Sequence, residues 1–180
     1  MLRAERARGT ALGLEADAYT SKGCLFPDHL ALRVVGEWLD GRTRFILDGF
    51  PRTVGQAVAF DSLLLSRSLP LDTVYLLELP DADVRARMLG RLTCSSCGAV
   101  FNETFHKITA QTPCPHCRGA LTRRTDDTVE ALDQRLAQYA EITRPVADHY
   151  RAQGILKAVD VRPGRDAVFQ TIYNDIREAA

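Results

Sequence analysis

Several features are missing from this 180-residue sequence, and each excludes a class of protein. No apolar run approaches the ~18 residues of a membrane-spanning helix, and no signal-peptide core follows Met1. Lys and Arg together number 23, as do Asp and Glu, so the formal net charge is zero. No overall field therefore attracts nucleic acid or an anionic membrane, and we expect neither as a partner. Because a membrane span and a signal peptide are missing and the cysteine usage is typical of reduced proteins, we expect a cytoplasmic location.

Lysine is also scarce, with three residues against twenty arginines. The planar guanidinium of Arg matches phosphate and carboxylate groups, so the positions of the arginines matter more than their number. Codon bias in a GC-rich genome is an alternative explanation for the excess.

Four of the five cysteines form two C-x-x-C pairs, Cys94–Cys97 and Cys114–Cys117, separated by residues 98–113. Four thiolates at this spacing suit a tetrahedral Zn²⁺ site, although iron is not distinguished from zinc. Two disulfides, or buried apolar thiols, are the alternatives. Paired cysteines in a chain that is not secreted favour a metal, and four protein ligands leave no open catalytic position.

The apolar pattern predicts an α/β fold with a parallel sheet. Short continuous apolar runs, typical of strands that are buried on both faces, span residues 44–48, 73–79 and 155–161. Helices are predicted over 28–39, 53–68 and 164–178, and another is predicted to begin at 81. A further long helix is predicted to be capped by Asp126 or Asp127 and to be bent or restarted at Pro145. The cysteine region, 92–122, interrupts this alternation as a small inserted module.

The segment 47–53 follows the first predicted strand and carries chemistry. Asp48 lies at the carboxyl end of that strand, where open α/β sheets place their ligands. Gly49 allows a ligand to approach the backbone, and Arg52 supplies a guanidinium. A simple tight turn is the alternative.

Together these segments resemble an adenylate kinase of the zinc-bearing bacterial form, over essentially the whole chain. The matching stretches are Met1–Arg3, 23–28, 45–53 with Gln56, 85–91, the four cysteines, and 124–127 with Arg135. The resemblance implies the reaction ATP + AMP ⇌ 2 ADP, with Mg²⁺ accompanying ATP and a structural Zn²⁺. It also implies a monomer with the fold of the P-loop nucleoside monophosphate kinases.

The resemblance assigns AMP to one group of residues. Arg3 and Arg52 would hold its phosphate, and Gln56 the adenine edge. The pocket would also be lined by the backbone of Cys24, Leu25, Phe26, Gly49, Phe50 and Pro51. The family more often has Val where Phe26 stands.

ATP and the transferring phosphoryl group would contact a second set of residues. Arg87 would lie against the adenine and Arg91 would reach the phosphates. Arg124 and Arg135 would close over the phosphoryl group and AMP. The backbone of Val100, Phe101 and Ala158 would contact ATP, Asp48 would hold Mg²⁺ through water, and Asp126 and Asp127 would organise a lid hinge. Val161 replaces the usual Gly after Asp160.

The resemblance also predicts three regions. A core at 1–91 contains the AMP-binding region at about 1–26, a zinc-binding lid spans 92–122, and the rest of the core spans 123–180. The family's G-x-x-x-x-G-K-[ST] phosphate loop is missing, so we expect a sheet without its first, central strand. A start site assigned at an internal Met, or a shortened protein, would explain this.

The missing loop predicts that the 180-residue chain lacks measurable kinase activity, because the loop supplies a main electrostatic contribution. Three alternatives stay open: a non-catalytic nucleotide-binding or regulatory protein, a zinc-ribbon interaction module, and a kinase for another nucleobase.

Overall fold

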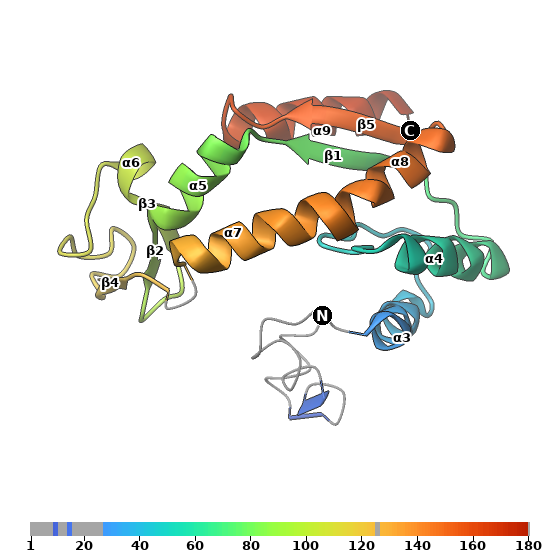
Figure 1. Cartoon of the computed structure of the whole chain (residues 1–180), viewed down its shortest axis with the longest axis horizontal. Coiled ribbons are helices and arrows are strands. Elements are labelled where there is room, and N and C mark those ends of the chain that lie inside the picture. Colours follow the sequence, from blue (N-terminus) through green and yellow to red (C-terminus); the bar gives the residue numbers. More distant parts are fainter. Residues whose placement is uncertain (1–8, 11–13, 16–26, 125–126, 180) are drawn as a thin grey trace. The chain divides into compact units, whose positions relative to one another are not determined.

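The computed structural model describes residues 9–10, 14–15, 27–124 and 127–179 (Figure 1). Of the predicted site residues, Arg3, Cys24, Leu25, Phe26 and Asp126 lie outside these ranges. The chain divides into two compact units: Met1–Val74 with Glu141–Lys157, and Tyr75–Ala140 with Ala158–Ala180. Among the described helices, none is both long and apolar enough to cross a bilayer.

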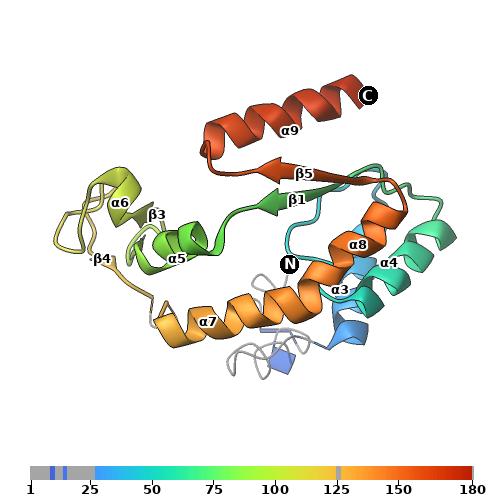
Figure 2. The ribbon, with the colours of Figure 1, turned by 45° about the horizontal axis from the view of Figure 1, so that its top comes forward.

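From residue 27 onward, the first unit contains three helices. They are α3 (Asp28–Leu39), α4 (Val54–Ser66) and α8 (Arg144–Ala152), and α4 contacts both of the others (Figure 2). Thr53 caps α4, since its hydroxyl accepts the backbone N–H of Gln56 at 3.0 Å. The predicted helices over 28–39 and 53–68 are confirmed.

Phe60 of α4 belongs to a hydrophobic core cluster of this unit and is 1 % exposed. The rings of Phe45 and Phe50 meet its ring edge to face, at centroid distances of 6.1 and 5.2 Å. The other buried members of this cluster are Val35, Leu39 and Leu64. A second cluster joins α4 to α8 through Ala57, Val146 and Tyr150.

The predicted strand over 44–48 is wrong, because this segment is irregular and pairs with no strand in the described part of the chain. Phe45 and Leu47 pack against the Phe60 cluster, whereas Ile46 is 84 % exposed. Apolar side chains hold the segment in place, and Asp48 at its end is exposed.

The other two predicted strands are confirmed as β1 (Val74–Glu78) and β5 (Leu156–Asp160), which pair with each other. The N–H of Val74 donates to the carbonyl of Ile155 at 2.9 Å, and that of Val161 to Glu78 at 3.1 Å. Both residue numbers rise together, so the strands are parallel, as Figures 1 and 2 show. The α/β class with a parallel sheet is confirmed.

Helix α9 (Arg165–Ala179) follows β5 and is tied to β1 by a hydrogen bond from the hydroxyl of Tyr75 to Asp175. Burial, together with the Asp175 carboxylate, raises the pKa of Tyr75 to about 12.

The rest of the second unit contains a small antiparallel sheet between two helices. Helix α5 (Asp81–Leu89) leads into β2 (Arg91–Cys94), β3 (Val100–Asn102), the short helix α6 (Glu103–His106) and β4 (Leu121–Thr122). The strand order is β3-β2-β4, and Leu92 lies opposite Phe101. Those two residues, Leu121, Cys94 and Cys114 form its core.

Helix α7 (Val129–Gln138) ends in a π-helical turn at Tyr139–Thr143, and α8 begins at Arg144 with Pro145 in its first turn. The predicted restart at Pro145 is confirmed. The predicted cap by Asp126 or Asp127 is wrong, because the hydroxyl of Thr128 accepts the N–H of Ala131, while Asp127 pairs with an arginine.

Replacing Phe60 with Ala should lower the free energy of unfolding by ~3–5 kcal/mol, because it removes a buried ring and leaves a cavity. The matched control is Leu65→Ala on the same helix. Leu65 is 81 % exposed, so we expect a change within about 0.5 kcal/mol. Urea unfolding followed by circular dichroism measures both, and equal losses would contradict this description of the core.

Candidate functional site

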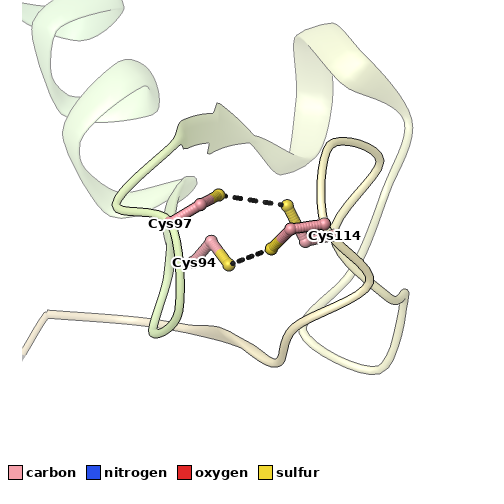
Figure 3. A group of neighbouring side chains, drawn as sticks. Cys94, Cys97 and Cys114 are labelled. Atoms are coloured by element: carbon pink, nitrogen blue, oxygen red, sulfur yellow. Dashed lines mark hydrogen bonds between the residues drawn. The ribbon is translucent and has the colours of Figure 1, made fainter.

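The four knuckle cysteines form one cluster in the second unit, with all four sulfur atoms within 4.8 Å of one another. Sγ of Cys94 lies 3.5 Å from that of Cys117, and Sγ of Cys97 lies 3.7 Å from that of Cys114 (Figure 3). Zinc with ~2.3 Å bonds to four sulfurs requires edges of ~3.8 Å, so the thiols fit the ion. All four are free, which contradicts the two-disulfide alternative.

Each knuckle is a tight turn at an end of the small sheet. The N–H of Gly98 donates to the carbonyl of Cys94 at 3.0 Å, and that of Arg118 donates to Cys114 at 2.8 Å. Gly119 has no room for a side chain, since a Cβ there would lie 2.8 Å from Cβ of Ser96. The backbone itself therefore brings the two knuckles together.

The thiols influence one another's ionisation. The pKa of Cys94 is lowered to about 6, chiefly because the backbone N–H of Cys97 points at its sulfur. At Cys117 the N–H of Gly119 acts in the same direction, but the thiols of Cys97 and Cys94 outweigh it and raise the pKa to about 12. Several thiolates this close repel one another, so a bound cation would favour the fully ionised cluster.

Two arginines from different elements converge on the carboxylate of Asp127, whose side chain is only 2 % exposed. Arg91, at the start of β2, donates from Nε to Oδ2 at 2.8 Å and from Nη2 to Oδ1, which makes the pair bidentate. Nη1 of Arg135 on α7 lies 4.0 Å from the same Oδ1. Arg124 is half-buried, and its carbonyl accepts the N–H of Asp127 at 3.2 Å.

The predicted contacts to the ATP base lie in the same unit. Nη2 of Arg87 donates to the carbonyl of Val161 at 2.9 Å, and its guanidinium lies 5.6 Å from the ring centroid of Phe105. Val100 is 52 % exposed, whereas Phe101 is buried in the core of the small sheet. The hydrogen bond to Val161 places Arg87 beside the end of β5, the strand that contains Ala158.

The first unit brings together Gly49, Arg52 and Gln56. Nε of Arg52 donates to the carbonyl of Gly49 at 2.7 Å, and its backbone N–H donates to Oε1 of Gln56 at 2.8 Å. Gly49 has φ +76°, a backbone conformation that side-chain-bearing residues rarely adopt, and a Cβ there would lie 3.0 Å from Nη2 of Arg52. Phe50 instead packs into the core beside Phe60, and Asp48 is exposed.

Sequence reasoning missed Asp28 as a member of this group. Its Oδ1 accepts Nε2 of Gln56 at 2.7 Å and its Oδ2 accepts the hydroxyl of Thr53 at 2.8 Å. The available signal was an acidic residue in the first turn of a helix, which usually marks only helix capping.

Comparison with known proteins decides the family. The sequence profile described as "Adenylate kinase" matches residues 1–155. An adenylate kinase of Thermodesulfovibrio yellowstonii is 42 % identical over 96 % of this chain and 81 % of its own length. Those of Desulfitobacterium hafniense and Desulforamulus reducens are 40 % and 39 % identical, over 89 % and 98 % of this chain and 75 % and 82 % of theirs.

The chain belongs to the adenylate kinase family. Membership implies the α/β fold of the P-loop nucleoside monophosphate kinases and a phosphotransferase acting on ATP, AMP and ADP, with Mg²⁺ accompanying ATP. The expectation of an inactive chain finds no support in these comparisons, and neither do the regulatory and zinc-ribbon alternatives.

The cysteine cluster predicts one zinc ion per chain, measurable by inductively coupled plasma mass spectrometry. Cys97→Ser should weaken zinc binding by at least ~10–100-fold. That is the usual loss when a residue that only supports a ligand is changed, and this variant removes a ligand itself. Cys24→Ser, which changes the cysteine outside both knuckles, is the control and should keep the metal. Undiminished zinc in Cys97→Ser would contradict the site.

The buried carboxylate of Asp127 predicts a large stability effect. Asp127→Asn should lower the free energy of unfolding by ~3–5 kcal/mol, because two arginines then lose their shared anion. Asp133→Asn is matched, since Asp133 also pairs with an arginine, Arg85, but is 52 % exposed. For Asp133→Asn we expect the free energy of unfolding to fall by less than ~1 kcal/mol. Thermal unfolding measures both variants, and similar losses of stability would contradict the prediction.

Proposed function

We propose that this chain transfers the terminal phosphoryl group of ATP to AMP, with Arg52, Arg91, Arg124 and Arg135 carrying the positive charge that the reaction needs. The observation that supports this best is the convergence of Arg91 and Arg135 on one buried carboxylate. The two oxygens of a carboxylate have a spacing similar to that of two oxygens of a phosphate group. The fork of an arginine side chain can therefore bind either anion through two hydrogen bonds. Groups arranged to hold one anion this way are suited to hold another.

The proposed chemistry needs positioning more than covalent help from the protein. In phosphoryl transfer, negative charge is spread over the equatorial oxygens while the attacking and leaving oxygens stay in line. Fixed arginines stabilise that charge without reorganising during the reaction. Arg91 would hold the phosphates of ATP, and Arg124 and Arg135 would contact the group in transfer.

AMP would bind at the first unit. Arg52 would hold its phosphate with Arg3, and Gln56 would read the adenine. The backbone of Cys24, Leu25, Phe26, Gly49, Phe50 and Pro51 would line the pocket. The carbonyl of Gly49, which accepts Nε of Arg52, would keep that guanidinium beside the exposed backbone turn.

ATP would place its base near Arg87, with Val100, Phe101 and Ala158 contributing backbone contacts. The exposed carboxylate of Asp48 would hold Mg²⁺ through water, which suits an ion that keeps several waters in its shell. When bound, Mg²⁺ neutralises phosphate charge. Asp126 and Asp127 would flank the lid hinge.

The cysteine module at 92–122 would be the lid, with residues 1–91 and 123–180 as the core. Zinc, held by Cys94, Cys97, Cys114 and Cys117, would stiffen a module whose own buried core has only five members. A closed lid would exclude water and so prevent ATP hydrolysis. We further propose a monomer in the cytoplasm.

A coupled assay of ADP formation from ATP and AMP tests this function. Arg135→Lys keeps the charge but loses the fork, and we expect kcat to fall ~10²-fold with a smaller change in KM. Arg151→Lys is the control, since Arg151 is 57 % exposed and pairs with Asp148 on its own helix. An inactive wild type, or equal rates for both variants, would overturn the proposal.

A further inference from the structure

We propose that Asp28 is a positioning residue that fixes the orientation of the Gln56 amide, and that this orientation selects adenine over a 6-oxopurine. The inference rests on the proposed role of Gln56 in reading the AMP base. It adds a residue of α3 that touches no nucleotide in the proposed pocket.

The amide of Gln56 is held between two partners of opposite character. Its Nε2 donates to Oδ1 of Asp28 at 2.7 Å, and its Oε1 accepts the backbone N–H of Arg52 at 2.8 Å. Gln56 is 4 % exposed, so water offers little replacement for either bond. Both bonds lie within the first unit.

Neither partner can exchange its role. An ionised carboxylate only accepts hydrogen bonds, and a backbone N–H only donates. Turning the amide over would place Oε1 against the carboxylate of Asp28 and Nε2 against the N–H of Arg52, so both contacts would become repulsive. The chemistry of these partners therefore defines which end of the amide is nitrogen, a distinction that side-chain shape alone does not make.

A fixed amide discriminates between purines because their edges differ in hydrogen-bonding character. Adenine donates from its 6-amino group and accepts at N1. Hypoxanthine and guanine accept at the 6-oxo group and donate from N1–H. An amide oriented to satisfy one pattern faces the other with a donor against a donor and an acceptor against an acceptor, which leaves buried groups unpaired.

The rest of the local structure keeps Asp28 in place. Oδ2 of Asp28 accepts the hydroxyl of Thr53, so that hydroxyl is left to accept the N–H of Gln56. Gly55 leaves space for the carboxylate, since a Cβ at that position would lie 3.3 Å from Oδ2. The residue is therefore anchored at the N-terminus of α4 through both of its oxygens.

Isothermal titration calorimetry with AMP and with IMP tests the inference on the full chain. Wild type should bind AMP more tightly than IMP. Asp28→Asn should reduce the ratio of the two dissociation constants severalfold, up to about tenfold, because an Asn side chain pairs with either end of the Gln56 amide and only the N–H of Arg52 then opposes the turned orientation. The ratio of the two dissociation constants does not depend on the fraction of protein that is folded, so a loss of stability alone would not change it.

Asp40→Asn is the matched control. It makes the same change at the other end of α3, where Asp40 pairs with Arg67 and not with Gln56, so the AMP/IMP ratio should stay that of wild type. A purely structural role for Asp28 would instead make Asp28→Asn lose affinity for the two nucleotides equally and leave the ratio unchanged.

The outcomes separate this inference from the proposed function. A wild type that does not prefer AMP, or a Gln56→Ala variant that keeps the preference, would overturn the role of Gln56 and the inference with it. Loss of preference in Gln56→Ala but not in Asp28→Asn would overturn the inference alone. If Asp28→Asn does not fold, NMR of wild type decides: nuclear Overhauser contacts from the Nε2 protons of Gln56 to the Cβ protons of Asp28 are expected, and their absence would refute the fixed amide.

Discussion

A guanidinium that is partly withdrawn from water must be given acceptors, and this requirement connects distant segments of the second unit. Arg91 receives the carboxylate of Asp127 and Arg87 the carbonyl of Val161, 36 and 74 residues further along the chain. Both contacts join an arginine to a distant segment, whereas the exposed Arg52 binds the carbonyl of Gly49 within its own turn. Charge that serves an anionic substrate thus also holds the substrate-free protein together.

The cysteine module solves a different problem, that of a segment too small to be stable through apolar burial alone. Its sheet has strands of two to four residues, and two of the five members of its buried core are Cys94 and Cys114 of the cysteine cluster. The other two thiols of the cluster, Cys97 and Cys117, are exposed. The proposed zinc would therefore bind side chains that also pack in the core, and its removal would disturb that core directly.

The sequence predicted the elements whose signals are local, namely two strands, the helices over 28–39 and 53–68, the restart at Pro145 and the four thiols. It failed where the outcome depends on a distant partner. The apolar run at 44–48 is not a strand because apolar contacts hold it in place, while no strand among the described residues pairs with it. Thr128 rather than Asp127 caps α7 because Arg91, 36 residues away, takes the carboxylate. Asp28 stayed hidden because its partners lie 25 and 28 residues further along the chain.

The attachment of the last helix has a consequence for alkaline conditions. The hydroxyl of Tyr75 holds Asp175 only while the phenol keeps its proton, and its pKa of about 12 lies above the ordinary value near 10. A raised pKa of this kind stabilises the folded chain fully below pH ~10, and the contribution disappears as the pH rises from there toward 12. Helix α9 is therefore held by a proton donor that persists throughout neutral and mildly basic solution.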